Sequence, residues 1–304
     1  MRAARGAAGW AAGLVALVLL SACTGGSTGT AAGPTDPPTG SPVLPATPVM
    51  QYAALGDSYT SAPFVPVTDL AGGCLRSDGN YPQLVAAALG ARVTDVSCGA
   101  ATTRDLTSPQ SVGGGRGTVP PQVRAVLPDT DLVTLGIGGN EGDLFARLAV
   151  ACVGLGGTPL RRCGDLSGAL EDAGGVIAET GSRVATALRA VRDAAPRAEV
   201  VLVGYPRLAD PAHSCPDLPL PAPDRKAVAQ LERRLDAALR GAARVADARF
   251  LDVRALSRGH EICSADPWVN GNRTDPQRAL AFHPFAVEQQ AVADAVVGLL
   301  AEDR

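Results

Sequence analysis

The stretch YAALGDSYTSAP, residues 52–63, places an acid and a serine directly after an apolar run. Small or polar residues such as Gly56, Asp57 and Ser58 at the end of a strand are typical of a simple turn. The same residues would also present a serine hydroxyl where a buried strand ends. The rest of the chain is needed to decide between a turn and a nucleophilic serine.

Apolar segments alternate with longer Ala-rich segments over residues 49–304. We predict strands at 51–56, 92–97, 131–138, 199–206 and 249–253, and helices at 81–90, 120–128, 175–196, 222–246 and 284–302. Near-continuous apolar strands divided by helices are typical of a parallel sheet that helices cover on both faces. We therefore expect one α/β domain over residues 49–304, with a central parallel sheet of about five strands.

Three turns of unusual composition would meet at one edge of this sheet. Ser58 follows the first strand, SCGAATT (97–103) follows the second, and GIGGNEGD (136–143) follows the third. Ligands of open α/β sheets bind outside the carboxyl ends of the strands. Each turn alone is ordinary, but together they favour a functional site at this edge.

The first 23 residues have the pattern of an export signal. Arg2 and Arg5 precede an apolar run over 10–20, and LSAC ends at Cys23. The apolar run is shorter than the roughly 20 residues that span a membrane. LSAC resembles the bacterial lipobox, so we expect a lipid-modified Cys23 that anchors an exported protein to a membrane. An ordinary signal peptide with an incidental cysteine is the alternative.

The segment 24–48 is rich in Thr, Gly, Ser, Ala and Pro, and we expect it to be a disordered tether. The formal net charge of -3 and the absence of a basic stripe with aromatics give no nucleic-acid signature. The chain also lacks a phosphate-binding G-x-x-x-x-G-K-[ST] motif and a C-x-x-C spacing. We expect no metal and no cofactor.

Four blocks of the sequence resemble the SGNH hydrolases, a branch of the GDSL esterases and lipases. GDSY carries Ser58, SCGAATT carries Gly99, GIGGN carries Asn140, and FHPFAVEQQAVADAV carries His283. All four blocks occur in the order of that family. The resemblance implies a flavodoxin-like, three-layer α/β/α sandwich and an esterase or lipase.

The resemblance also implies a role for each of these residues. Ser58 would attack an ester carbonyl, and His283 would serve as the base that a weakly nucleophilic hydroxyl needs. The N–H groups of Ser58 and Gly99 and the Asn140 amide would hold the oxyanion, each donor contributing roughly 3–4 kcal/mol.

The chain has three histidines, and two of them fit a catalytic role less well than His283. His213 lies in a proline-rich segment beside a cysteine. His260, in SRGHEICSAD, lies beside an expected disulfide. His283 directly precedes Pro284 at the start of the last predicted helix, where a loop-to-helix junction would hold it at the edge of the sheet.

The chain departs from the family at the position of the triad acid. Many members carry Asp three residues before the histidine, and this chain has Leu280 there. The pattern therefore favours a Ser–His dyad, in which the Leu280 main-chain carbonyl orients His283. Asp266 and Asp275 are the competing acceptors.

Six cysteines follow Cys23, an even number that indicates disulfides in an exported chain although 15 pairings are possible. Sequential pairing is the simplest hypothesis, and the resemblance to secreted actinobacterial esterases points the same way. The expected pairs are Cys74–Cys98, Cys152–Cys163 and Cys215–Cys263.

We thus expect an exported, monomeric serine esterase or lipase whose partner is an ester substrate. One alternative is an O-acetyl esterase that acts on cell-envelope carbohydrate. The other is an inactive binding lipoprotein, which would be expected to have lost at least one of Ser58, Gly99, Asn140 and His283, and all four are present.

Overall fold

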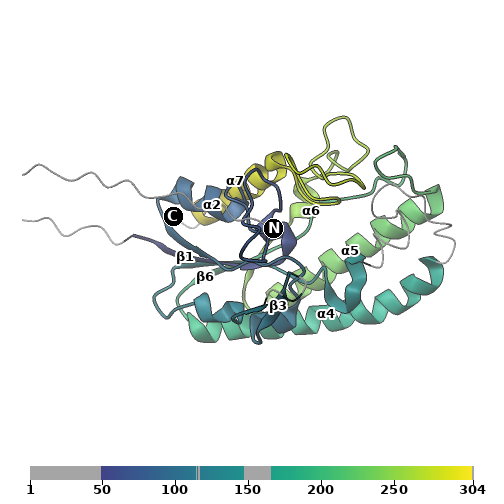
Figure 1. Ribbon diagram of the computed structural model, residues 1–304. Helices are drawn as coiled ribbons and strands as arrows, with labels where there is room; N and C mark the ends of the chain where they lie inside the picture. Colours follow the sequence, from purple (N-terminus) through teal and green to yellow (C-terminus); the bar gives the residue numbers. More distant parts are fainter. Residues whose placement is uncertain (1–48, 114, 116, 147–165, 303–304) are drawn as a thin grey trace, which may run out of the picture. The chain divides into compact units, whose positions relative to one another are not determined.

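The computed structural model describes residues 49–113, 115, 117–146 and 166–302 (Figure 1). The predicted signal peptide and tether, residues 1–48, lie outside the described residues. The described chain contains a parallel five-stranded sheet of order β2-β1-β5-β6-β7. Its strands are β1 (Gln51–Gly56), β2 (Arg92–Asp95), β5 (Leu132–Gly136), β6 (Glu199–Val203) and β7 (Arg249–Leu251).

Helices cover both faces of this sheet, with α2 and α7 on one side and α4 and α5 on the other (Figure 1). The α-helices are α1 (Ser58–Ser61), α2 (Tyr81–Leu89), α4 (Leu166–Ala194), α5 (Ala222–Val245), α6 (Val253–Leu256) and α7 (Ala286–Ala301). The predicted α/β/α sandwich around a parallel sheet of five strands is confirmed.

Side chains of the central strand β1 pack against the helices on both faces of the sheet. Ala53 and Leu55 belong to the core cluster formed with α4 and α5, whereas Tyr52 and Ala54 belong to the cluster formed with α2 and α7. Successive side chains of a strand point to opposite faces, so a strand that is apolar at every position must be covered twice. This is why YAAL can only be a central strand.

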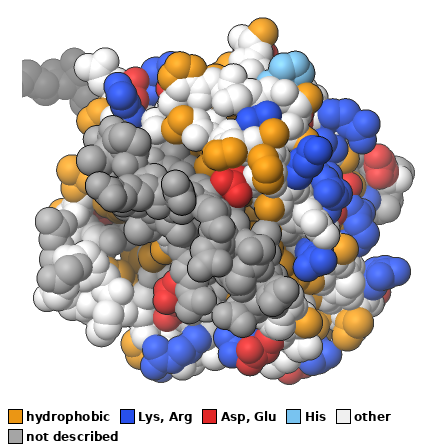
Figure 2. Space-filling model, turned by 90° about the vertical axis from the view of Figure 1, so that its right-hand side faces the viewer, with side chains coloured by type: hydrophobic (Ala, Val, Ile, Leu, Met, Phe, Trp, Pro, Cys, Tyr) orange, Lys and Arg blue, Asp and Glu red, His pale blue; other side chains and the backbone are white. Residues whose placement is uncertain are grey.

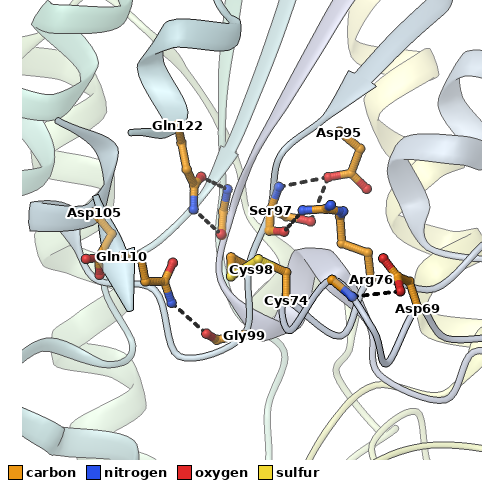
Figure 3. Close-up of a disulfide and its surroundings, with 12 residues drawn as sticks. Asp69, Cys74, Arg76, Asp95, Ser97, Cys98, Gly99, Asp105, Gln110 and Gln122 are labelled. Carbon is orange, nitrogen blue, oxygen red and sulfur yellow. Dashed lines mark hydrogen bonds between the residues drawn. A yellow bond between two sulfur atoms is a disulfide. The ribbon is translucent and has the colours of Figure 1, made fainter. Parts of the chain in front are cut away.

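The segment 120–128 does not form the predicted helix. Its only regular element is a 3₁₀ turn, η2 (Gln122–Ala125), after which Val126 is extended. Pro128 disfavours the helical conformation of the residue before it. At the other end of the segment, Pro120 and Pro121 lack the backbone N–H that a helix would use. The buried Gln122 side chain makes two hydrogen bonds to the Gly56 backbone, at 2.8 and 2.9 Å (Figure 3).

Two other elements differ from the sequence-based expectation. Helix α4 begins at Leu166 rather than 175, because the Gly174–Gly175 pair lies inside the helix instead of at its start. A short antiparallel hairpin, β3 (Gln110–Val112) with β4 (Gly117–Val119), has no sequence signal strong enough to predict it. Two further 3₁₀ turns, η1 (Thr103–Leu106) and η3 (Glu141–Asp143), follow β2 and β5.

Two of the three predicted disulfides are present in the described residues. Cys74 is bonded to Cys98 and Cys215 to Cys263, so both predicted pairs are confirmed. The predicted Cys152–Cys163 pair lies outside the described residues.

None of the helices described in the structure is long and apolar enough to cross a membrane. Basic, acidic and hydrophobic side chains are intermixed on the face that Figure 2 displays.

Candidate active site

Ser58 is the first residue of α1, directly after the turn that ends β1. The Asp57 side chain caps this short helix by accepting a hydrogen bond from the Tyr59 N–H at 2.9 Å. Gly56 is required at the end of the strand, because a Cβ there would lie 2.2 Å from Thr60 Oγ1 and 2.7 Å from the Gly136 carbonyl oxygen. The turn predicted from GDS therefore holds the serine at the carboxyl edge of the sheet.

His283 lies against Ser58, as the sequence predicts. Its Nε2 is 2.8 Å from Ser58 Oγ, and the imidazole is buried. The Tyr59 ring lies 5.2 Å from the imidazole centroid, and the Phe145 ring contacts it edge-on at 5.7 Å. Burial lowers the pKa of His283 from its ordinary value of 6.5 to about 4, although the Ala281 carbonyl acts in the opposite direction. The imidazole is therefore neutral at neutral pH and free to accept a proton.

The carbonyl group that orients His283 belongs to Ala281, one residue after the predicted Leu280. His283 Nδ1 lies 2.7 Å from the carbonyl oxygen of Ala281, not that of Leu280. The Leu280 carbonyl instead accepts hydrogen bonds from the His283 N–H, at 3.1 Å, and from Asn270 Nδ2, at 3.2 Å. The backbone reverses at Phe282, whose φ of 61° is left-handed. This turn directs the Leu280 carbonyl away from the ring and the Ala281 carbonyl toward it.

A carbonyl oxygen can only accept a hydrogen bond, so Nδ1 carries the proton and Nε2 is the acceptor for the Ser58 hydroxyl. The competing aspartates are occupied elsewhere. Asp266 lies 3.5 Å from His260 Nδ1, and the Asp275 side chain caps the Gln277 N–H. Neither makes a hydrogen bond to His283.

The other two histidines lie away from the serine. His213 is exposed and pairs with Asp210 at 2.5 Å. His260 stacks on Trp268, with ring centroids 4.2 Å apart.

Asn140 follows β5 and lines the same pocket as Ser58. Its Nδ2 donates one hydrogen bond, at 2.9 Å, to the Ala101 carbonyl. An amide nitrogen has two hydrogens, so a second donor remains for a ligand.

The Gly99 N–H, which the sequence analysis predicted to hold the oxyanion, already has a hydrogen-bond partner in the structure. It donates to the Cys74 carbonyl at 2.9 Å, and the Gly99 carbonyl accepts from Gln110 Nε2 at 2.8 Å (Figure 3). The next residue, Ala100, has a left-handed φ of 61°, and its N–H has no hydrogen-bond partner among the described residues. The donor left free in this turn is therefore that of Ala100.

A comparison with known protein families identifies the family of this chain. The model of the GDSL-like lipase/acylhydrolase family matches residues 54–287. This chain belongs to that family. The predicted membership of the GDSL esterases and lipases, and with it the predicted ester hydrolase, is confirmed.

Relatives of this GDSL hydrolase are similar along most of its length. Lipase 2 of Streptomyces coelicolor is 37% identical over 275 residues, which cover 85% of this chain and 88% of that protein. A crystal structure of phospholipase A1 from Streptomyces albidoflavus has a TM-score of 0.70 at 27% identity and covers 83% of this chain and 99% of that one. The extracellular lipase of Streptomyces rimosus also has a TM-score of 0.70, at 28% identity, and covers 82% and 99%.

The sequence analysis missed Tyr205, which joins two turns of the GDSL hydrolase site. Its hydroxyl donates to Asp57 Oδ2 at 2.5 Å and accepts from the Gly139 N–H at 2.9 Å. It thereby links the residue before Ser58 to the residue before Asn140. Burial raises the pKa of Asp57 to about 7, and the Tyr205 hydrogen bond opposes this shift. The only sequence signal was the place of Tyr205 near the end of the fourth predicted strand, 199–206.

A pocket opens beside Ser58, with a cavity volume of about 70 Å³, enough for several water-sized groups. Most of its wall is apolar and comes from the turn after β5, the segment after β6, and α5. The apolar wall residues are Leu144, Phe145, Pro206, Leu208, Val228, Leu231 and Leu235.

Within the part of the chain that the structure describes, no group of three or more His, Cys, Asp or Glu side chains is placed to hold a metal ion.

Proposed function

We propose that this protein hydrolyses carboxylic esters through a Ser58–His283 dyad and an acyl-enzyme. The observation that carries the proposal is the pair of hydrogen bonds on His283, with Nε2 2.8 Å from Ser58 Oγ and Nδ1 2.7 Å from the Ala281 carbonyl. A base held in this tautomer beside a serine is the arrangement that activates a hydroxyl for attack.

In the first half of the reaction, Ser58 Oγ attacks the ester carbonyl carbon while its proton moves to His283 Nε2. The tetrahedral intermediate then collapses, the bond to the alcohol oxygen breaks, and His283 returns the proton to the departing alcohol. In the second half, His283 takes a proton from water, which attacks the acyl-serine. Collapse of this second intermediate releases the acid and restores the Ser58 hydroxyl.

The negative charge on the carbonyl oxygen needs fixed donors. We assign them to the Ser58 N–H, the second hydrogen of Asn140 Nδ2 and the Ala100 N–H. Ala100 takes the place of Gly99 in this proposal, because the Gly99 N–H already donates to the Cys74 carbonyl.

We also propose that the protein is exported and held to a membrane through a lipid on Cys23. Two disulfides in the described domain support export, since disulfides persist in oxidising compartments. The similar Streptomyces rimosus lipase is itself extracellular.

Turnover of p-nitrophenyl acetate, octanoate and palmitate tests the proposed function. We expect hydrolysis of all three esters, with kcat/KM lower for palmitate than for octanoate because a cavity of about 70 Å³ cannot enclose a long chain. A fluorophosphonate should label the Ser58 peptide in a stoichiometric reaction. No turnover and no labelling would contradict the proposal. Turnover of acetate alone, together with release of acetate from acetylated polysaccharide, would favour the O-acetyl esterase.

The Cys74–Cys98 disulfide should support both stability and catalysis. It is adjacent to the Gly99–Ala100 turn (Figure 3), and the Gly99 N–H donates a hydrogen bond to the Cys74 carbonyl. The double substitution Cys74→Ala and Cys98→Ala should lower the free energy of unfolding by about 2–4 kcal/mol, and it should also lower kcat. Denaturant unfolding and p-nitrophenyl acetate turnover measure the two effects.

Removal of the Cys215–Cys263 disulfide is the matched control. The Cys215–Cys263 bond closes a longer segment, with a sequence separation of 48 against 24. Neither of its cysteines adjoins the Gly99–Ala100 turn or another proposed oxyanion donor. Its loss should reduce stability by a similar amount and kcat by less. Equal losses of kcat in the two double variants would contradict a specific role for Cys74–Cys98.

A further inference from the structure

Tyr59 directly follows the proposed nucleophile, and its hydroxyl takes no part in the proposed mechanism. This hydroxyl donates a hydrogen bond to the Phe282 carbonyl at 2.6 Å. The two residues are 223 positions apart in the chain, and Phe282 lies directly before His283. A single side chain therefore joins the turn that carries Ser58 to the turn that carries His283.

The turn before His283 contains an unfavourable backbone conformation. The Leu280 carbonyl accepts from the His283 N–H at 3.1 Å, so Phe282 is the third residue of a β-turn. Its φ of 61° is one that glycine or asparagine usually supplies at this position. A residue with a bulky side chain adopts a left-handed φ only where its surroundings impose it. Neighbouring groups must therefore hold this turn.

Two peptide groups meet at Phe282, and hydrogen bonds hold both of them. In the first, the Ala281 carbonyl lies 2.7 Å from His283 Nδ1, and the Phe282 N–H donates to the Gly271 carbonyl at 3.0 Å. In the second, the Phe282 carbonyl accepts from Tyr59 and the His283 N–H donates to Leu280. Loss of the Tyr59 hydroxyl would free the carbonyl side of the second group, so that the backbone carrying His283 could rotate relative to the Ala281 carbonyl.

Tyr59 is itself held in place at its backbone and at its ring. Its N–H donates to Asp57 Oδ1 at 2.9 Å, and its carbonyl accepts from Gln289 Nε2 at 3.1 Å. Its ring centroid lies 5.2 Å from that of the His283 imidazole and 5.2 Å from that of Tyr205, which it meets edge-on. The hydroxyl is therefore a donor at a fixed position.

We propose that Tyr59 is a positioning residue for His283: its hydroxyl fixes the turn at Phe282 and thereby keeps Nδ1 on the Ala281 carbonyl and Nε2 on Ser58. This inference rests on the proposed function. In the described chain no carboxylate makes a hydrogen bond to His283. A carboxylate could follow the imidazole through its side-chain torsions, whereas a carbonyl moves only with its backbone. The orientation of His283 therefore depends on how firmly this turn is held.

Tyr59→Phe tests the proposal, because it removes the hydroxyl and keeps the ring. A fluorophosphonate reaction carried to completion counts the folded sites. The kcat for p-nitrophenyl acetate per labelled site should fall by a factor between about 10 and 10², the size of loss that a small misplacement of a catalytic group causes. KM should remain unchanged, because His283 serves both halves of the reaction and both slow together. The rate constant of fluorophosphonate labelling should fall in parallel with kcat.

Tyr52→Phe is the matched control. Tyr52 is buried in β1, and its hydroxyl lies 2.7 Å from Thr134 Oγ1, within the core cluster formed with α2 and α7. Its loss removes a buried tyrosine hydrogen bond of the same kind but leaves the turn before His283 intact. We expect both variants to melt at a lower temperature than the wild type, and only Tyr59→Phe to lose kcat per labelled site.

A wild-type kcat per labelled site in Tyr59→Phe would overturn the inference. Equal losses in Tyr59→Phe and Tyr52→Phe would also overturn it, because the hydroxyl would then have a structural role alone. A rise in KM at unchanged kcat would assign Tyr59 to substrate binding instead of to His283. Failure of the wild type to hydrolyse any ester would overturn the proposed function and this inference with it, whereas an active wild type and an equally active Tyr59→Phe would overturn the inference alone.

Discussion

Ser58→Ala is expected to lower kcat for p-nitrophenyl acetate by about 10⁶-fold, the loss typical for removal of a nucleophilic serine. The variant has no oxygen to attack the carbonyl, whereas the donors for the oxyanion remain. Covalent labelling by a fluorophosphonate should disappear. The melting temperature should change little, because the hydrogen bond of Ser58 Oγ to His283 is the one side-chain contact removed.

Ser61→Ala is the matched control for this prediction. Ser61 lies in the same short helix, is fully buried, and its hydroxyl has no hydrogen-bond partner among the described residues. Its removal tests for general damage to α1 without removing a contact. We expect wild-type labelling and turnover from Ser61→Ala. Undiminished labelling of Ser58→Ala would assign the nucleophile to another residue.

His283→Ala is expected to have an effect of similar size, since the members of such a catalytic unit act together. The wild-type pH profile tests the same residue without a mutation. A general base works only when it is unprotonated, and burial lowers the pKa of His283 to about 4. Activity should therefore persist as the pH falls through 6.5, and kcat/KM should decline only near pH 4. A decline centred near pH 6.5 would mean that the free enzyme exposes the imidazole to water.

Two aspartate variants test whether His283 works without a carboxylate partner. The Asp266 carboxylate lies near His260, and that of Asp275 accepts from the Gln277 N–H, so both contacts are away from His283. Asp266→Asn and Asp275→Asn should therefore each keep kcat within about tenfold, or roughly 1.4 kcal/mol in the barrier. Removal of a true triad acid costs about 10⁴-fold. A loss of that size in either variant, with the fold intact, would contradict the dyad.

Local patterns predicted most of the fold. The central strands could be recognised because a strand buried on both faces is apolar at every position, as in YAAL before Gly56. The segment 120–128 was predicted wrongly because its apolar spacing is helical, while its prolines and the tertiary hydrogen bonds of Gln122 favour a 3₁₀ turn. The hairpin of β3 and β4 is too short to leave a periodic pattern.

For the site, the amino-acid sequence by itself singled out Ser58, Asn140 and His283, because the first two follow predicted strands and the third directly precedes the last predicted helix. Only the tertiary structure decided how the neighbouring backbone groups are engaged. The Ala281 carbonyl rather than that of Leu280 meets His283, and the Ala100 N–H rather than that of Gly99 is free. Every residue has a carbonyl and nearly every residue an N–H, so composition cannot distinguish them. Their directions depend on φ and ψ in turns such as the one at Phe282, which neighbouring elements impose.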